Sequence, residues 1–117
     1  LSMRTGLRSV SFAGYGRGVS SRDWVGAALA EPVVEPTGTA GGGMIYSTGT
    51  THLISAALTR ATRGSTHAHA VRTLGRPLGI RIPPWTTDPQ GISFGGNEMR
   101  MTPRDLLRLA EALRAEG

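Results

Sequence analysis

The sequence predicts a mainly α-helical protein, and three observations support this expectation. Several segments place apolar residues three or four positions apart, which is the spacing of one side of a helix. Polar residues suited to capping a helix precede these segments, and glycine or proline follows them. No segment alternates apolar and polar residues convincingly, as a half-buried strand does.

The length of 117 residues corresponds to one domain with a modest core. Because the chain has no cysteine, it cannot form disulfides or thiolate metal sites, and its compartment stays open between periplasm and cytoplasm. No apolar run approaches the roughly 20 residues of a membrane helix. The first residue is Leu1 and no signal peptide is visible, so we expect an excerpt of a longer product.

The net charge is +5, and all thirteen basic residues are arginine. The absence of lysine excludes any chemistry that needs an amine side chain. The arginines are scattered along the chain without a dense block, which favours a solvated basic surface over a nucleic-acid partner.

The first half of the chain is expected to contain loops and two helices. Residues 1–20 hold four glycines and no clean period, so we expect mostly loop. Residues 20–32 predict a short helix capped by Ser20 or Ser21 and ended by a proline. A linker over 31–43 then leads to a helix from Thr50 onward. Its expected buried stripe is Leu53, Ile54, Ala57, Leu58 and Ala61.

Residues 65–80 predict a further short helix that ends near Gly75, and residues 81–101 predict an irregular stretch rich in proline and glycine. The last helix has the clearest start, because Thr102 suits the N-cap, proline follows, and Asp105 lies at the third helical position. The expected buried stripe of this helix is Leu106, Leu107, Ala110 and Leu113.

Two short motifs are weak candidates for function. "GISFG" matches the G-x-S-x-G pattern around a nucleophilic serine, but no strand precedes Ser93 and no helix follows directly. His67 and His69 are two positions apart, so a helix would direct them to different faces, and no acidic cluster completes a metal site. We therefore expect neither a nucleophile at Ser93 nor a metal ion.

Tyr46 precedes a predicted helix start in "YSTGTTHL". A free phenol has a pKa near 10, so it is a poor base at neutral pH unless its surroundings favour the phenolate. A helix N-terminus would help modestly, and a neighbouring ammonium would help more. From physical chemistry alone, a packed tyrosine at a helix start is the simpler interpretation.

A family resemblance favours a catalytic role instead. "GGGMIYSTGTTHLISAALTRAT" is similar to the stretch around the Y-x-N motif in class C-type serine hydrolases of the β-lactamase and penicillin-binding-protein superfamily. "LSMRTGL", "RPLGI" and "GISFGGNEMRMTPRDLLRLAEAL" resemble other blocks of this family, in the family's order. The resemblance spans nearly all of the chain and is nearest to the branch of esterases and aminohexanoate-oligomer hydrolases.

The resemblance implies an enzyme that cleaves an ester or amide through an acyl-serine, without metal or organic cofactor. Tyr46 would be the motif tyrosine, which accepts a proton from the serine and returns it to the leaving group. Thr48 stands where the family has asparagine; we expect it to bind substrate, although its shorter hydroxyl places β-lactam turnover in doubt.

Neither S-x-x-K nor K-T-G can occur in a chain without lysine, and H-x-G is absent too. We therefore expect residues 1–117 to be one partial catalytic domain: the helical portion of a β-lactamase-like fold, inactive alone, with its sheet mostly outside this chain. Its partner would be a small ester or amide substrate and not nucleic acid or membrane. Self-association through exposed faces is a further hypothesis. The alternatives are an inactive binding or scaffold remnant of the same fold and a basic, nucleic-acid-associated helical protein.

Overall fold

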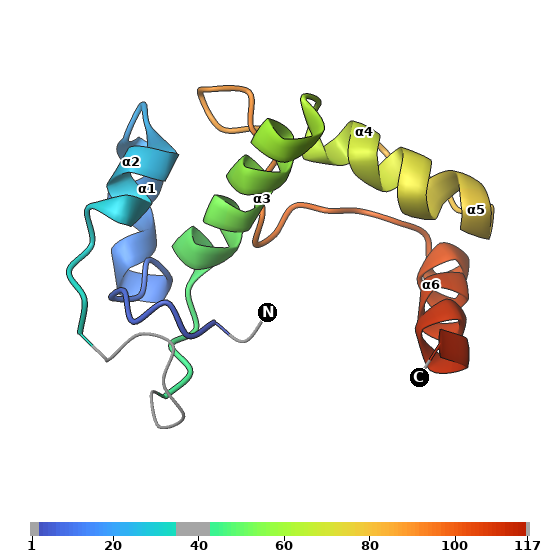
Figure 1. Ribbon diagram of the computed structural model, residues 1–117, viewed down its shortest axis with the longest axis horizontal. Coiled ribbons are helices and arrows are strands. Elements are labelled where there is room, and N and C mark those ends of the chain that lie inside the picture. Colours follow the sequence, from blue (N-terminus) through green and yellow to red (C-terminus); the bar gives the residue numbers. More distant parts are fainter. Residues whose placement is uncertain (1–2, 35–42, 117) are drawn as a thin grey trace.

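The computed structural model describes residues 3–34 and 43–116. Within these ranges the protein is mainly helical, as predicted, and its only strand-like contacts are two isolated antiparallel bridges, Leu7–Val33 and Thr87–Ser93. In Figure 1, α3 stands between α1 and α2 on one side and α4 and α5 on the other, and α6 lies beyond α5. The elements are η1 (Phe12–Gly14), α1 (Tyr15–Ser20), α2 (Trp24–Leu29), α3 (Thr48–Thr62), α4 (Thr66–Ala70), the π-helical turn η2 (Val71–Gly75), α5 (Arg76–Leu78) and α6 (Pro103–Glu116).

The expected loop over residues 1–20 is wrong in its second half, because η1 and α1 occupy residues 12–20. Glycines disfavour helices, but here they permit close packing. A Cβ atom on Gly18 would lie 2.9 Å from Cγ1 of Val10, so α1 approaches the preceding segment only because that side chain is missing. Tertiary packing outweighs local propensity at this position.

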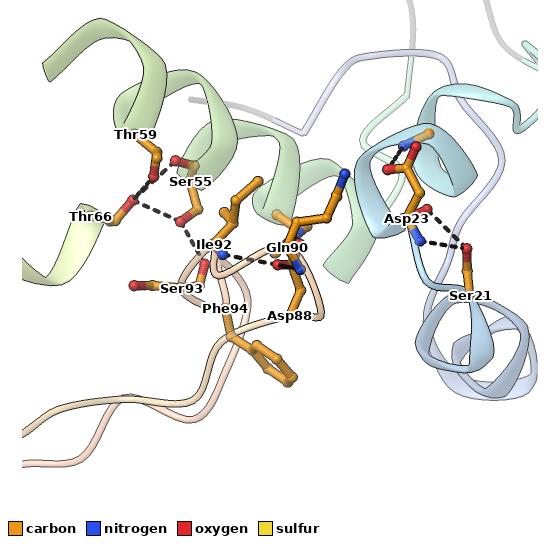
Figure 2. Close-up of polar contacts among 12 residues, drawn as sticks. Ser21, Asp23, Ser55, Thr59, Thr66, Asp88, Gln90, Ile92, Ser93 and Phe94 are labelled. Carbon is orange, nitrogen blue, oxygen red and sulfur yellow. Dashed lines mark hydrogen bonds and ion pairs between the residues drawn. The ribbon is translucent and has the colours of Figure 1, made fainter. Parts of the chain in front are cut away.

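The predicted caps of α2 are wrong by two or three residues. Asp23 caps this helix, since its Oδ1 accepts a hydrogen bond from the Gly26 amide at 2.8 Å. Ser21 instead contacts the capping residue: its hydroxyl oxygen accepts a hydrogen bond from the Asp23 amide at 3.0 Å (Figure 2). Ser21 therefore positions the N-cap residue Asp23 but is not itself the N-cap.

The α3 helix begins at Thr48, two residues earlier than predicted, with Ser47 as its N-cap. The Ser47 hydroxyl oxygen lies 3.2 Å from both the Thr50 amide and the Val10 amide and accepts from each. One side chain thus caps the helix and fastens the segment around Val10 to it. Its exposed fraction is 1%.

The predicted apolar stripes of α3 and α6 are not the buried faces. The α3 helix buries small and polar residues instead: Gly49, Thr50, His52 and Ser55. A Cβ atom on Gly49 would lie 3.0 Å from Val10 and 3.4 Å from Ala28. The missing side chain therefore lets Val10 and Ala28 pack closely against this face of α3. In α6 the leucines 106, 107 and 113 are exposed by 56% to 69%.

The buried polar side chains of α3 have hydrogen-bond partners. The Ser55 hydroxyl donates to the Ser93 carbonyl at 2.6 Å and lies 2.8 Å from the Thr66 hydroxyl (Figure 2). Satisfied hydrogen bonds remove the main cost of placing polar side chains in a core. This explains why helical periodicity of apolar residues misidentified the packed side of α3.

Two further helix boundaries can be compared with those predicted from the sequence. The expected helix end near Gly75 is wrong: the helical path continues through η2 and α5 until Gly79, which takes a left-handed φ of 60°. Pro77, which has no N–H to donate, lies just after the π-helical turn, where the regular α-helical hydrogen bonding is interrupted. The start of α6 is confirmed, since the Asp105 amide donates to the Thr102 hydroxyl at 3.1 Å.

Substitution of Ser47 by alanine is expected to lower the free energy of unfolding by about 2 kcal/mol, because it removes a helix cap and leaves the buried Val10 amide without an acceptor. Ser65→Ala is the matched control: Ser65 caps α4 through the Ala68 amide alone, so the expected loss is about 1 kcal/mol. Urea unfolding followed by circular dichroism measures both. An equal loss in the two variants would contradict the double role of Ser47.

Candidate functional site

Three segments distant in the sequence meet at the first turn of α3. Residues 5–11 run along it and form hydrogen bonds with residues 46–50. Gly95 and Gly96 lie against its other side: a Cβ atom on Gly95 would overlap the Thr51 carbonyl oxygen, and one on Gly96 would lie 2.7 Å from Cγ2 of Thr48. The three parts therefore fix the backbone around the sequence-predicted site.

Tyr46 directly precedes the helix cap and is half exposed. Its carbonyl oxygen accepts a hydrogen bond from the Ser9 hydroxyl at 2.6 Å, which fixes the backbone. Its ring lies 6.0 Å from the ring of Phe12 at an angle of 35°. Among the described residues no group hydrogen-bonds its hydroxyl, so the phenol is open to an external partner.

Thr48 is the first residue of α3, and the Ser11 side chain contacts it twice. The Thr48 amide donates to the Ser11 hydroxyl oxygen at 2.7 Å, and the two hydroxyl oxygens lie 2.9 Å apart. The sequence patterns gave no sign of Ser11, because its partner lies 37 positions away. Thr48 also lines a cleft, whereas Tyr46 lies outside the set of residues that forms it.

This cleft lies between α1, α2, the first turn of α3 and the loop 94–97. Its cavity volume is about 30 Å³, and it is open to solvent. The walls are mainly apolar and include an aromatic contact between Trp24 and Phe94, whose ring centroids are 4.5 Å apart. Thr48 and Asn97 are also among the lining residues. A cavity of this size has room for only a few atoms, and its walls favour an apolar group.

A buried pair of His52 and Asp88 holds the floor of the cleft in place. His52 Nε2 lies 2.9 Å from Asp88 Oδ2, and the side chains are exposed by only 5% and 0%. Asp88 Oδ1 also accepts from the amides of Gln90 and Ile92 at 2.8 and 2.9 Å (Figure 2). The carboxylate thus joins the turn 88–92 to the middle of α3, and no sequence pattern indicated this pair.

Two nitrogen atoms in the cleft walls have no hydrogen-bond partner among the described residues: Nε1 of Trp24 and Nδ1 of His52. Both atoms are closed off from solvent, so a ligand in the cleft does not reach them without movement of the walls.

The weaker sequence candidates have other contacts. Ser93 is exposed by only 1%, and no helix follows it directly, since the next one, α6, begins at Pro103. His67 Nε2 donates to the Ile82 carbonyl at 3.0 Å, and His69 Nδ1 accepts from Arg72 at 3.1 Å. Within residues 3–34 and 43–116, no group of three histidine, aspartate or glutamate residues is placed to hold a metal ion.

Comparison with known proteins adds no assignment: no protein-family model matches the chain, and no curated protein sequence matches it. None of the helices in the described ranges is long and apolar enough to span a membrane.

Gly95→Ala is expected to displace the loop 94–97 from α3 and to lower the free energy of unfolding by about 2 kcal/mol, because its Cβ atom would lie 2.7 Å from the His52 Cα atom. The control is Gly16→Ala on α1, where no atom lies within 4 Å of the new methyl group. That variant should be neutral or slightly stabilising.

Thermal unfolding and amide NMR spectra of the two glycine variants test this packing. Shifts at Thr51 and His52 are expected in Gly95→Ala only. Wild-type stability of Gly95→Ala would show that the loop does not pack against α3 as described.

Proposed function

We propose that this chain is the tyrosine-bearing, helical segment of a β-lactamase-like serine hydrolase that cleaves an ester or amide through an acyl-serine. The observation that supports it most is the convergence at α3. The segments that resemble the family, residues 1–7, 41–62 and 91–113, are far apart in the sequence. They nevertheless meet around Tyr46 and Thr48, through the contacts of Thr5 with Thr50 at 3.2 Å and of Gly96 with Thr48.

In this proposal Tyr46 moves the proton. Its phenolic oxygen accepts the proton of the attacking serine and later donates it to the leaving group. The half-exposed ring and the unengaged hydroxyl are compatible with that role, since the base must reach a serine that this chain does not supply. Thr48, two residues further on, offers its hydroxyl to the substrate.

The remaining catalytic groups must come from sequence outside residues 1–117, because a chain without lysine has no S-x-x-K or K-T-G motif. The exposed leucines of α6 support a larger domain, since an amphipathic helix gains its stability by burying its apolar face. The segment alone should not catalyse acyl transfer. An inactive binding remnant of the same fold is the alternative, and loss of the flanking motifs from the gene would favour it.

In the full product of the gene, Tyr46→Phe is expected to lower kcat for p-nitrophenyl ester hydrolysis by about 10²- to 10⁴-fold, because the general base is removed. The ring and its contact with Phe12 remain, so the unfolding midpoint should stay unchanged. Stopped-flow detection of p-nitrophenol and thermal unfolding measure the two effects. Unchanged turnover in a folded variant would refute the role of Tyr46.

A further inference from the structure

We propose that Phe12 is a specificity-determining residue that binds the leaving group of the substrate beside Tyr46, and that this leaving group is an aromatic or alkyl alcohol or amine. The inference rests on the proposed function for its reaction. It adds the chemical class of one half of the substrate and a further residue of the site. Neither Phe12 nor Tyr46 lines the cleft.

Phe12 exposes its ring to solvent. Its exposed fraction is 85%, and the next highest value for a large apolar side chain among the described residues is 69%, at Leu113. Such exposure forgoes the stabilisation that a buried aromatic ring supplies. The half-exposed ring of Tyr46 lies beside it, with the ring centroids 6.0 Å apart and the planes tilted by 35°. The two rings therefore form one aromatic surface at the proposed proton-transfer group.

The backbone of Phe12 is strained. Its φ is 50°, in the left-handed region where a Cβ atom crowds the following carbonyl oxygen. Hydrogen bonds of the buried Ser11 hold this conformation: its hydroxyl oxygen accepts from the Thr48 amide at 2.7 Å, and its carbonyl oxygen accepts from the Gly14 amide at 3.0 Å. Glycine would fit here without strain. A strained residue that also exposes a large ring indicates a binding role for that ring.

The proton transfer decides which half of the substrate lies nearest to Phe12. When the bond between the carbonyl carbon and the leaving oxygen or nitrogen breaks, the leaving atom keeps the bonding electrons and takes the proton of the Tyr46 hydroxyl. The acyl group stays on the serine. The leaving atom is thus hydrogen-bonded to the phenol. A phenylethyl substituent on that atom is long enough to reach the ring of Phe12, because the two ring centroids are only 6.0 Å apart.

The aromatic surface also decides the chemistry of that substituent. The side chain of Phe12 offers no hydrogen-bonding atom, so an anionic or strongly hydrated group loses water without gaining a partner. A second ring packs against Phe12 in a tilted or offset arrangement, and an alkyl group is removed from water by the same contact. The favoured leaving groups are therefore alcohols such as 2-phenylethanol, or the corresponding amines, rather than small or charged ones.

The test uses the full product of the gene and two isomeric esters, 2-phenylethyl acetate and ethyl phenylacetate. They carry the same phenyl ring, on the leaving group in the first and on the acyl group in the second. Titration of the released acid at constant pH gives kcat/KM for each ester. Phe12→Ala should lower the ratio of kcat/KM, 2-phenylethyl acetate over ethyl phenylacetate, by about 5- to 10-fold, because one aromatic contact is lost. The change should lie mainly in KM, since Tyr46 still transfers the proton.

Three further variants isolate the contribution of the ring. Phe12→Tyr retains an aromatic ring and should retain the wild-type ratio. Leu29→Ala removes an exposed apolar side chain of α2 and should also leave the ratio unchanged. Phe12→Gly should unfold about 3 °C above Phe12→Ala, because only glycine takes a φ of 50° without crowding.

An unchanged ratio in Phe12→Ala, with both esters hydrolysed, would overturn the inference and leave the proposed function intact. Wild-type turnover of ethyl phenylacetate alone would place the apolar group on the acyl side and overturn it as well. An unfolding midpoint of Phe12→Gly at or below that of Phe12→Ala would remove the strain on which the binding role of the ring depends. A wild-type product that hydrolyses neither ester would refute the proposed function and this inference together.

Discussion

The hydroxyl of Ser47 is the contact on which the rest of the structure depends. It accepts from the amides of Thr50 and Val10, so the start of α3 and the segment 5–11 are held by one buried atom. The Ser11 hydroxyl oxygen makes a similar contact with the next residue of the chain, because it accepts a hydrogen bond from the Thr48 amide. Because the first amides of a helix have no partners within the helix, side chains from elsewhere can bind them. The cleft and the candidate site follow from this junction.

Polar contacts, rather than a large apolar core, hold the remaining parts against α3. Ser55 joins it to Ser93 and Thr66, and His52 joins it to Asp88. Glycines 49, 95 and 96 permit the short distances that these bonds need. An intact buried hydrogen-bonded pair adds little to the free energy of unfolding, but a buried polar group left without its partner is strongly destabilising. Such contacts therefore select one arrangement of the chain more than they raise its stability. This rigidity is what a site built at the first turn of α3 requires.

The sequence predicted the helical class, the irregular stretch 81–101 and the start of α6 at Thr102, because each depends on local signals such as caps and prolines. It failed for α1, where Gly18 is used for packing against Val10, and for the buried face of α3. Those features depend on partners that are distant in the chain. Tyr46 and Thr48 are predicted as site residues by family resemblance alone, whereas Ser11, His52 and Asp88 form contacts across 36 or 37 positions and leave no short motif.

Sequencing the coding DNA on both sides of this segment tests the central claim most directly. The proposed hydrolase requires a serine and lysine in S-x-x-K upstream of Leu1, and K-T-G or H-x-G downstream of Gly117. Both motifs in one reading frame with this segment are the predicted result. A start codon at Leu1 together with a stop codon after Gly117 would contradict the account, because Tyr46 would then have no serine to activate.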